Sequence, residues 1–396
     1  MSQATRTRPA DRRAQLLDAA AVAFGARGYA AVSLGDIAAA VGISAPALYR
    51  HVPNKYALFA EVAQAEMTAL LEAARAVPDP DDLDAVLLAI AGRTVDHRDH
   101  GSLYRWEARF LTEEDRGRLR ATTRALRASV AGPLARRRTA TRGAVPDEAD
   151  PTLLASAALA VVASVTAHRL VLPDLAERVA RLAAAVAQVP LPPSPGPAPA
   201  PGPEPAWRAT LAPSSTRERL LVEALRAFER HGYLGATMEE IARAVGLSAP
   251  AAYRYVPTKA ALLAEAFSRS QIRLDAVVRA ALADVDAADE ALPALAAAYV
   301  RLWFQQPEVM SVWGAEAGHL GDDEREELRA VQRDHVAVWV ALLREVRPDL
   351  DPVDARLRVH AALTVVVDTG RLLRFDRRRP VRDRVVALVL GVLLAP

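Results

Sequence analysis

One segment of this sequence occurs twice, and the repeat limits the possible folds more than any other feature. Val41-Gly-Ile-Ser-Ala-Pro-Ala-Leu-Tyr-Arg-His-Val-Pro53 recurs as Val245-Gly-Leu-Ser-Ala-Pro-Ala-Ala-Tyr-Arg-Tyr-Val-Pro257. The same offset of 204 residues relates the preceding segments without a gap, as from Gly28 to Gly232. Self-similarity at a fixed spacing indicates repeated structural units. The chain is therefore expected to contain two copies of one unit.

The rest of each copy has diverged, and a proline-rich segment separates the copies. Glu107 and Glu316 correspond only at a changed offset of 209 residues. Segment 190–213 reads as a semi-rigid polyproline linker that reaches about 70 Å at roughly 3.1 Å per residue. The expected domains are the two repeated N-terminal units at 10–62 and 214–266, two C-terminal helical domains at 63–189 and 267–396, and this linker at 190–213.

Composition favours an all-α globular protein and excludes several classes. Of the 396 residues, 52% are hydrophobic, so large cores are possible, and abundant alanine favours helices. The formal net charge is +2, so any nucleic-acid surface must be local. Cysteine is absent, which rules out disulfides and thiolate metal sites and fits a cytoplasmic location. The polar N-terminus is unlike a secretion signal, and segment 152–167 reads as a buried helix rather than a membrane span.

Helix signals recur at equivalent places in the two copies. In the first copy, an apolar face on one helix ends at Gly28, where a positive backbone φ is expected. Ser33 and Asp36 form a capping-box pattern that starts a second helix. Gly42 permits a sharp turn, and Ser44 caps a short third helix. Two short helices joined by a tight turn form a helix-turn-helix.

The third helix carries residue types suited to DNA. Small residues at its start can enter the major groove, while the Tyr49-Arg50 and Tyr253-Arg254 pairs can reach phosphates or base edges. The chain has only two lysines, Lys55 and Lys259, at equivalent positions after this helix. We interpret them as phosphate contacts, although two solvated surface lysines would be an ordinary alternative.

These motifs resemble the DNA-binding domain of the TetR family, present twice. The resemblance implies an all-α fold, pairing through C-terminal helices, a palindromic operator and release from DNA by a small ligand. It also implies the DNA-facing residues of both copies, to which we add two arginines of the N-terminal arm. These residues are Arg6, Arg8, Ser33, Ala45, Pro46, Ala47, Tyr49, Arg50, His51, Lys55, Thr237, Ala249, Pro250, Ala251, Tyr253, Arg254, Tyr255 and Lys259.

Fusion of the two copies changes the expected assembly. One chain can present both DNA-binding domains at the 34–36 Å spacing of one DNA turn, roughly as a family dimer does. His51 corresponds to Tyr255, so the operator is expected to be an imperfect palindrome. The first copy has an arginine-rich arm that includes Arg12 and Arg13, whereas glutamates surround the second, so we expect the first to supply more affinity. A homodimer of the whole chain is the competing assembly.

The C-terminal parts mark an effector site only weakly. Segments 151–170 and 352–375 are the expected bundle helices. A hydrophobic effector site is assigned to aromatic and acidic residues of both copies, although aromatics at helical spacing are more often core. The candidates are Trp106, Glu107, Phe110, Trp303, Trp313, Glu316 and Trp339. Segment 96–100 contains metal-ligand residue types but reads as a solvated loop, and neither a metal nor a cofactor is expected.

The leading hypothesis is a ligand-responsive transcription regulator, most simply a repressor. The alternative is a sensor or scaffold with only one domain competent for DNA. Both copies retain the Tyr-Arg pair and the lysine, which argues against that alternative. An enzyme is not expected, because no nucleophile, phosphate loop or zinc motif stands out.

Overall fold

The computed structural model describes residues 9–101, 107–142, 149–196 and 215–396. Throughout these residues, the regular elements are helices and no strand occurs, which confirms the all-α prediction. Two compact units are present. The first unit comprises Met1–Pro146 and Val161–Ala187, and the second comprises Asp147–Ala160 and Gln188–Pro396.

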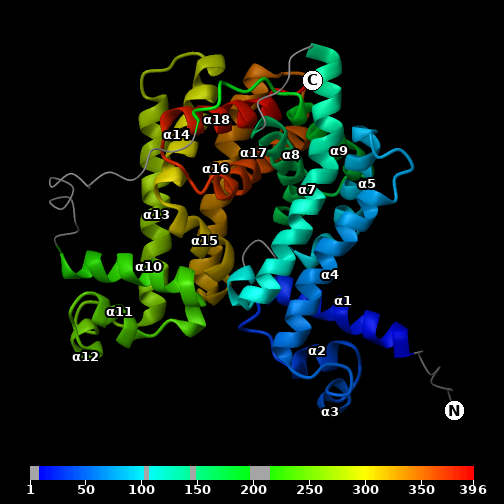
Figure 1. Ribbon diagram of the computed structural model, residues 1–396. Coiled ribbons are helices and arrows are strands. Elements are labelled where there is room, and N and C mark those ends of the chain that lie inside the picture. The colour runs from blue at the N-terminus through cyan, green and yellow to red at the C-terminus, as the bar shows by residue number, and fades with distance from the viewer. Residues whose placement is uncertain (1–8, 102–106, 143–148, 197–214) are drawn as a thin grey trace. The chain divides into compact units, whose positions relative to one another are not determined.

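Each unit contains a three-helix domain, here called a head (Figure 1). The first head is built from α1 (Pro9–Arg27), α2 (Leu34–Ala40) and α3 (Ala45–Leu48). The second head repeats this order with three helices of matching length and position. These are α10 (Thr216–Gly235), α11 (Met238–Ala244) and α12 (Ala249–Ala252).

Local signals in the sequence account for the helix ends of the first head. The Ser33 side chain accepts a hydrogen bond from the Asp36 N–H, and the Asp36 carboxylate accepts one from the Ser33 N–H, which completes the capping box. The Ser44 hydroxyl accepts a bond from the Ala47 N–H at the start of α3. Gly28 has a φ of 78° and Gly42 a φ of 68°, as the sequence predicts for these turns.

The core of each head is a small apolar cluster. In the first head, Leu16 and Phe24 of α1, Ile37 of α2 and Leu48 of α3 are at most 1% exposed. Phe59 of the following helix packs edge-on against Phe24, with ring centroids 5.7 Å apart. Burial of Leu48 fixes which face of the short α3 turns away from the core.

The C-terminal part of the first unit begins with α4 (Lys55–Arg75), which leads away from the head (Figure 1). It packs against α5 (Leu83–Asp96) and against α7 (Glu113–Arg142), and α5 packs against α9 (Leu175–Ala187). Short 3₁₀ turns join them. These are η1 (Arg98–His100), η2 (Ala108–Phe110) and η3 (Ser164–Ala167).

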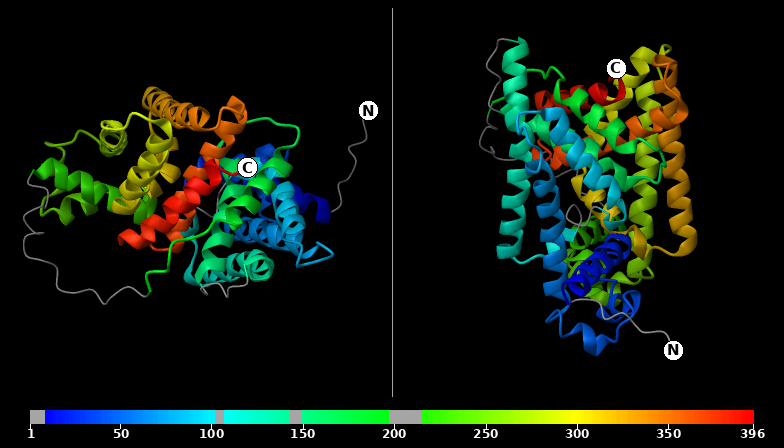
Figure 2. Two further views of the ribbon diagram at one scale, coloured as in Figure 1. Left: turned by 90° about the horizontal axis from the view of Figure 1, so that it is seen from above. Right: turned by 90° about the vertical axis from the view of Figure 1, so that its right-hand side faces the viewer.

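The second unit continues from its head through α13 (Lys259–Leu282). The elements after α13 are α14 (Ala288–Gln305), α15 (Pro307–Glu316), η5 (Ala317–His319), α16 (Asp322–Val346), α17 (Pro352–Leu372) and α18 (Arg379–Leu393). Helix α17 packs against α16 and α18, and α14 packs against α13, α16 and α18 (Figure 2).

Helix α8 (Ala149–Ala163) is divided between the units, since its residues up to Ala160 group with the second. Within the second unit, the Arg384 guanidinium of α18 pairs with Asp150 and donates to the Pro192 carbonyl at 3.0 Å. Asp150 precedes the linker and Arg384 follows it. The second unit therefore includes a segment from the first sequence copy, while the domain limits expected from sequence stay a prediction.

Segment Asp150–Ala167 is long and apolar enough to cross a membrane by length and composition alone. Of this segment, 67% is buried within the protein, and the side chains of Leu154, Ala158 and Val161 are fully buried. This burial fits the core helix expected from the sequence.

Candidate nucleic-acid interface

The short helices α3 and α12 present the same surface in the two heads. Tyr49 is 57% exposed and Tyr253 is 48% exposed. Arg50 and Arg254 are also exposed, and neither pairs with an acidic group among the described residues. In each head, an unpaired guanidinium group and an exposed phenol thus form a surface that can donate to phosphates and to base edges.

The remaining residues expected to face DNA are also at the surface. They lie at the start or just past the end of α3 and α12, or cap α2 and α11, and all are exposed or half-buried. These residues are Ser33, Ala45, Pro46, Ala47, His51, Thr237, Ala249, Pro250, Ala251 and Tyr255. Ser33, Tyr49 and Lys55 line one open hollow on the first head. Arg6 and Arg8 lie outside the described residues.

We call α3 and α12 the recognition helices. Arg13 contacts the segment at the end of α3 rather than extending into an arm. Its Nη1 donates to the His51 carbonyl at 2.8 Å, and its Nη2 lies 2.7 Å from Glu61 Oε2. In the second head, Arg217 makes the same pair of contacts, with the Tyr255 carbonyl at 2.8 Å and Glu265 at 2.8 Å. We call this arrangement the arginine clamp. The sequence signal was present, because arginine and glutamate both recur at the repeat offset.

The two lysines point into their own heads. Lys55 Nζ donates to the Ala30 carbonyl at 3.1 Å and lies 4.5 Å from the centroid of the Tyr29 ring. Lys259 Nζ donates to the Tyr233 carbonyl at 2.6 Å and lies 4.5 Å from the centroid of that ring. Desolvation lowers the pKa of both lysines. These contacts support the loop before α2 or α11, and a phosphate contact stays a prediction.

Glu107 lies beneath the first head instead of lining an open site. Its side chain is buried, and Oε2 accepts a hydrogen bond from the Tyr29 N–H at 2.9 Å. Arg109 Nη2 lies 3.7 Å from Oε1. In the second unit, Glu316 is equally buried, with His319 Nε2 at 3.5 Å. Glu107 thus satisfies the backbone at the end of α1 from a distant part of the chain.

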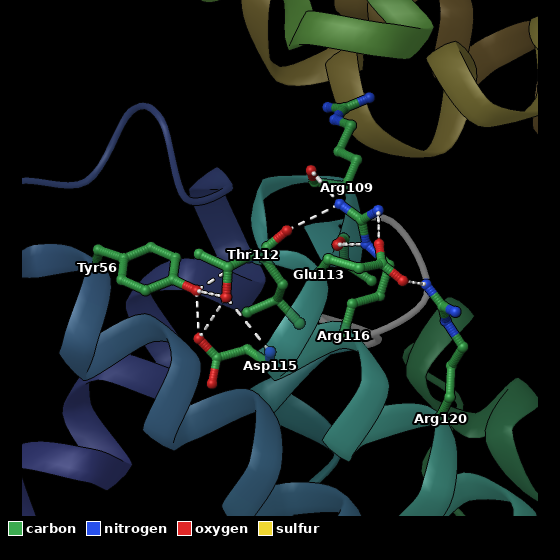
Figure 3. Close-up of polar contacts among 9 residues, drawn as sticks. Tyr56, Arg109, Thr112, Glu113, Asp115, Arg116 and Arg120 are labelled. Atoms are coloured by element: carbon green, nitrogen blue, oxygen red, sulfur yellow. Dashed lines mark hydrogen bonds and ion pairs between the residues drawn. The ribbon is translucent and has the colours of Figure 1, made fainter.

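A second polar contact ties α4 to α7 directly after the recognition helix (Figure 3). The Tyr56 hydroxyl bonds to the Asp115 carboxylate and accepts from the Thr112 N–H at 2.9 Å. The corresponding residue in the second copy is Ala260, which has no hydroxyl. This connection therefore distinguishes the first unit from the second.

The other effector candidates lie mainly in cores. Phe110 packs near Tyr29, with ring centroids 5.3 Å apart. In the second unit, Trp303 and Trp339 are 6% and 0% exposed, and both stack edge-on against Tyr299. Trp106 lies outside the described residues, as does the Trp313 side chain. The aromatic cluster is therefore packed, and its use as an effector site stays a prediction.

Comparisons with known proteins agree with the geometry of the heads. The family model described as bacterial regulatory proteins, tetR family, matches residues 16–62 and again residues 220–266. These matches cover the helix-turn-helix of both heads and the start of α4 and α13. No curated protein matches.

Solved structures of regulators match about half of this chain at a time. A TetR-family transcriptional regulator from Bordetella parapertussis 12822 is 21% identical, with a TM-score of 0.40, over 45% of this chain and 95% of its own. PfmR from Thermus thermophilus is 28% identical, with a TM-score of 0.36, over 42% and 92%. The ketosteroid transcriptional regulator KstR2 of Mycobacterium tuberculosis is 20% identical, with a TM-score of 0.41, over 46% and 94%.

Proposed function

Because this chain is a TetR-family DNA-binding transcription regulator with the family's DNA-binding domain present twice, we propose that one molecule binds one operator with both heads. It acts as an intramolecular pseudo-dimer on an imperfect palindrome. A small molecule bound among the C-terminal helices releases the DNA, so the protein is a ligand-responsive repressor. It works in the cytoplasm, where operator DNA is accessible.

The matching surfaces of α3 and α12 carry this proposal. Both heads keep the exposed Tyr-Arg pair and the arginine clamp, so both retain the parts needed to reach DNA. The differences are confined to a few positions, such as His51 opposite Tyr255. Two similar but unequal surfaces favour two similar but unequal half-sites.

Pairing within one chain is supported by which segments of the chain make up the second unit. That unit includes the start of α8, and Arg384 joins Asp150 to Pro192 at the beginning of the linker. Arg384 is only 3% exposed. Loss of one partner would leave a buried charge, which is strongly unfavourable. A helix that a second subunit could supply in a dimer is thus supplied in cis.

Ligand response is supported by the contact between Glu107 and the first head. Glu107 belongs to the segment between α5 and α7, and it bonds to the backbone at the end of α1. Movement of that segment changes the support of the head. Within each unit, the aromatic candidates suit a hydrophobic effector: Phe110 in the first, and Trp303 and Trp339 in the second.

Selection from a random DNA pool with the purified full-length protein tests the function. We expect one enriched imperfect palindrome, bound by one chain in light scattering. Arg50→Ala and Arg254→Ala should each abolish selection of a different half-site. Two chains on the selected DNA would contradict the pseudo-dimer, and a wild-type motif that contains a single half-site would favour the sensor with one competent head. Failure to enrich any sequence would contradict sequence-specific DNA binding.

A further inference from the structure

His100 occupies an unusual position between the first head and the helices that follow it. The sequence predicts a solvated loop at this position, and that prediction is wrong for His100, whose side chain is only 7% exposed. Its Nε2 lies 2.9 Å from Asp18 Oδ1 of α1, and its Nδ1 lies 2.8 Å from Glu66 Oε1 of α4. The imidazole therefore joins three segments of the chain through both of its nitrogens.

His97 completes a group of metal-ligand types at the same place. Its ring centroid lies 4.9 Å from that of His100, and it ends α5 just before η1. One donor atom from each of Asp18, His97 and His100 lies within 4.8 Å of the other two. A tetrahedral ion at about 2.0–2.2 Å from each ligand needs donors roughly 3.3 Å apart. His100 and Asp18 nearly meet this spacing, and binding of an ion requires the half-buried His97 side chain to move closer to them.

Glu66 supplies the outer-shell partner that such sites use. A ligating histidine commonly donates its other ring N–H to a carboxylate, which fixes the tautomer and the ring orientation. With Nδ1–H donated to Glu66, the lone pair of Nε2 faces Asp18. Arg93 lies 3.7 Å from Glu66 and balances its charge. An ion between Nε2 and Asp18 takes the place of the proton that otherwise joins them.

The backbone around His100 is fitted closely to α1. A Cβ atom at Gly25 would overlap the His100 carbonyl oxygen, so only glycine allows this approach. Gly101 follows with a φ of 66° and faces Gly25 in turn. The position of His100 relative to Asp18 is therefore determined by backbone contact and not by a flexible loop.

The second copy of the sequence lacks the same groups. At the repeat offset, Asp18 corresponds to Val222, Gly25 to Glu229 and Glu66 to Ser270. A general requirement for packing α1 on α4 would be expected in both copies. The cluster is instead particular to the first unit, which indicates a role specific to that unit.

We propose that Asp18, His97 and His100 bind a divalent transition-metal ion of the Zn²⁺ class, with Glu66 orienting His100. Two imidazoles and one carboxylate leave a fourth position for water, and this donor set suits Zn²⁺ and its neighbours rather than Ca²⁺ or Mg²⁺. The ion joins α1 of the first head to the end of α5. It makes the attachment of that head sensitive to metal, independently of any organic effector.

Titration of the purified full-length protein with ZnCl₂ in a calorimeter tests the site. We expect one ion per chain, with binding at least about tenfold weaker in His97→Gln and in Asp18→Asn. The His97 side chain makes none of the hydrogen bonds that hold the His100 imidazole, and Asp18 is exposed, so both variants should fold, as circular dichroism can check. His231→Gln, on the exposed surface of the second head, is the control and should bind as the wild type does.

Cobalt gives a second readout that does not depend on DNA. Co²⁺ in the site should show the visible absorption of a four-coordinate ion, and Zn²⁺ should raise the melting temperature of the wild type but not that of His97→Gln. Equal Zn²⁺ affinity in the wild type and in both ligand variants would overturn the proposal. So would the absence of saturable binding in the wild type.

Discussion

The Glu107 carboxylate accepts the backbone N–H of Tyr29 at 2.9 Å, across 78 positions of sequence. This bond joins the segment before α7 to the end of α1. It satisfies a donor at a helix end in a buried place, where an unpaired N–H costs about 1–3 kcal/mol. The contact thus contributes to both the stability of the first unit and the placement of its head.

Glu107→Ala should therefore lower the free energy of unfolding by about 1–3 kcal/mol. Glu107→Gln keeps an acceptor oxygen and should lose less. Urea denaturation followed by circular dichroism measures both. Glu113→Ala, which removes an exposed ion-pair partner, is the control and should change stability by at most about 1 kcal/mol. Equal effects of Glu107→Ala and Glu113→Ala would contradict this role.

The arginine clamp should matter more for DNA binding than for stability. Arg13 is half exposed, so its ion pair with Glu61 contributes at most about 1 kcal/mol to folding. Its bond to the His51 carbonyl, however, orients the end of the recognition helix. Arg13→Lys loses the planar fork of donors and should weaken binding to the selected operator in fluorescence anisotropy.

Arg217→Lys is the matched variant in the second head and should act in the same direction. Arg226→Ala removes an arginine that pairs with Glu223 on α10, away from the clamp, and is the control. Unchanged affinity in both clamp variants would show that the recognition helices are positioned without it.

The two heads should contribute unequally to affinity. Arg6 and Arg8 precede the first head in the sequence, whereas Glu239 and Glu240 start α11 in the second. Since neutralisation of phosphates dominates affinity, Arg50→Ala should weaken binding more than Arg254→Ala does. Loss of a base contact costs about 1–3 kcal/mol in binding free energy. The reverse order in anisotropy titrations at matched salt would refute this asymmetry.

The N-cap residues of the helices that follow the recognition helices should stabilise the two heads by similar amounts. The Asn54 side chain accepts the Ala57 N–H at 2.8 Å, and Thr258 accepts the Ala261 N–H at 3.0 Å. Alanine at either position should destabilise the protein by about 1 kcal/mol, and glycine by only a few tenths. Chemical denaturation of the four variants checks this. An alanine variant as stable as the glycine variant would exclude capping as the cause.

Acidification should destabilise the second unit through His335. Burial lowers the pKa of His335 to about 4, while its Nε2 accepts the Trp339 N–H at 3.1 Å. An unfolded histidine titrates near 6.5, so the unfolded state binds the extra proton as pH falls between these values. The stabilising contribution of neutral His335 is therefore fully present above about pH 6.5. As it is lost, the free energy of unfolding falls by about 2 kcal/mol between pH 7 and pH 5.

His335→Gln should reduce the slope of stability against pH but not abolish it. Burial also lowers the pKa of His360 to about 4, so that residue adds a contribution of the same sign. Urea denaturation at pH 5, 6 and 7 measures the slope, with His231→Gln as the control. Identical slopes in the wild type and His335→Gln would show that His335 titrates in the folded protein as it does in the unfolded chain.

The amino-acid sequence determined the repeated heads on local grounds. Capping residues such as Ser33, glycines with positive φ such as Gly42, and the apolar spacing that buries Leu48 act within a few residues of one another. The same short-range pattern placed Tyr49 and Arg50 on the exposed side at the end of α3. Spacing alone was sufficient there because helix geometry converts sequence distance directly into a face.

The tertiary structure alone decided the partners of the isolated charged residues. Arg13 was expected in an arm but clamps the recognition helix, Lys55 turns toward Tyr29, and His100 is buried between Asp18 and Glu66. Those contacts join residues dozens of positions apart, and those of Arg13 and Lys55 recur in the second head through Arg217 and Lys259. A charged side chain is about as stable in water as in an exposed ion pair. Its position in the sequence therefore does not show whether it is solvated or paired. Only the packing of helix against helix removes the water and selects the partner.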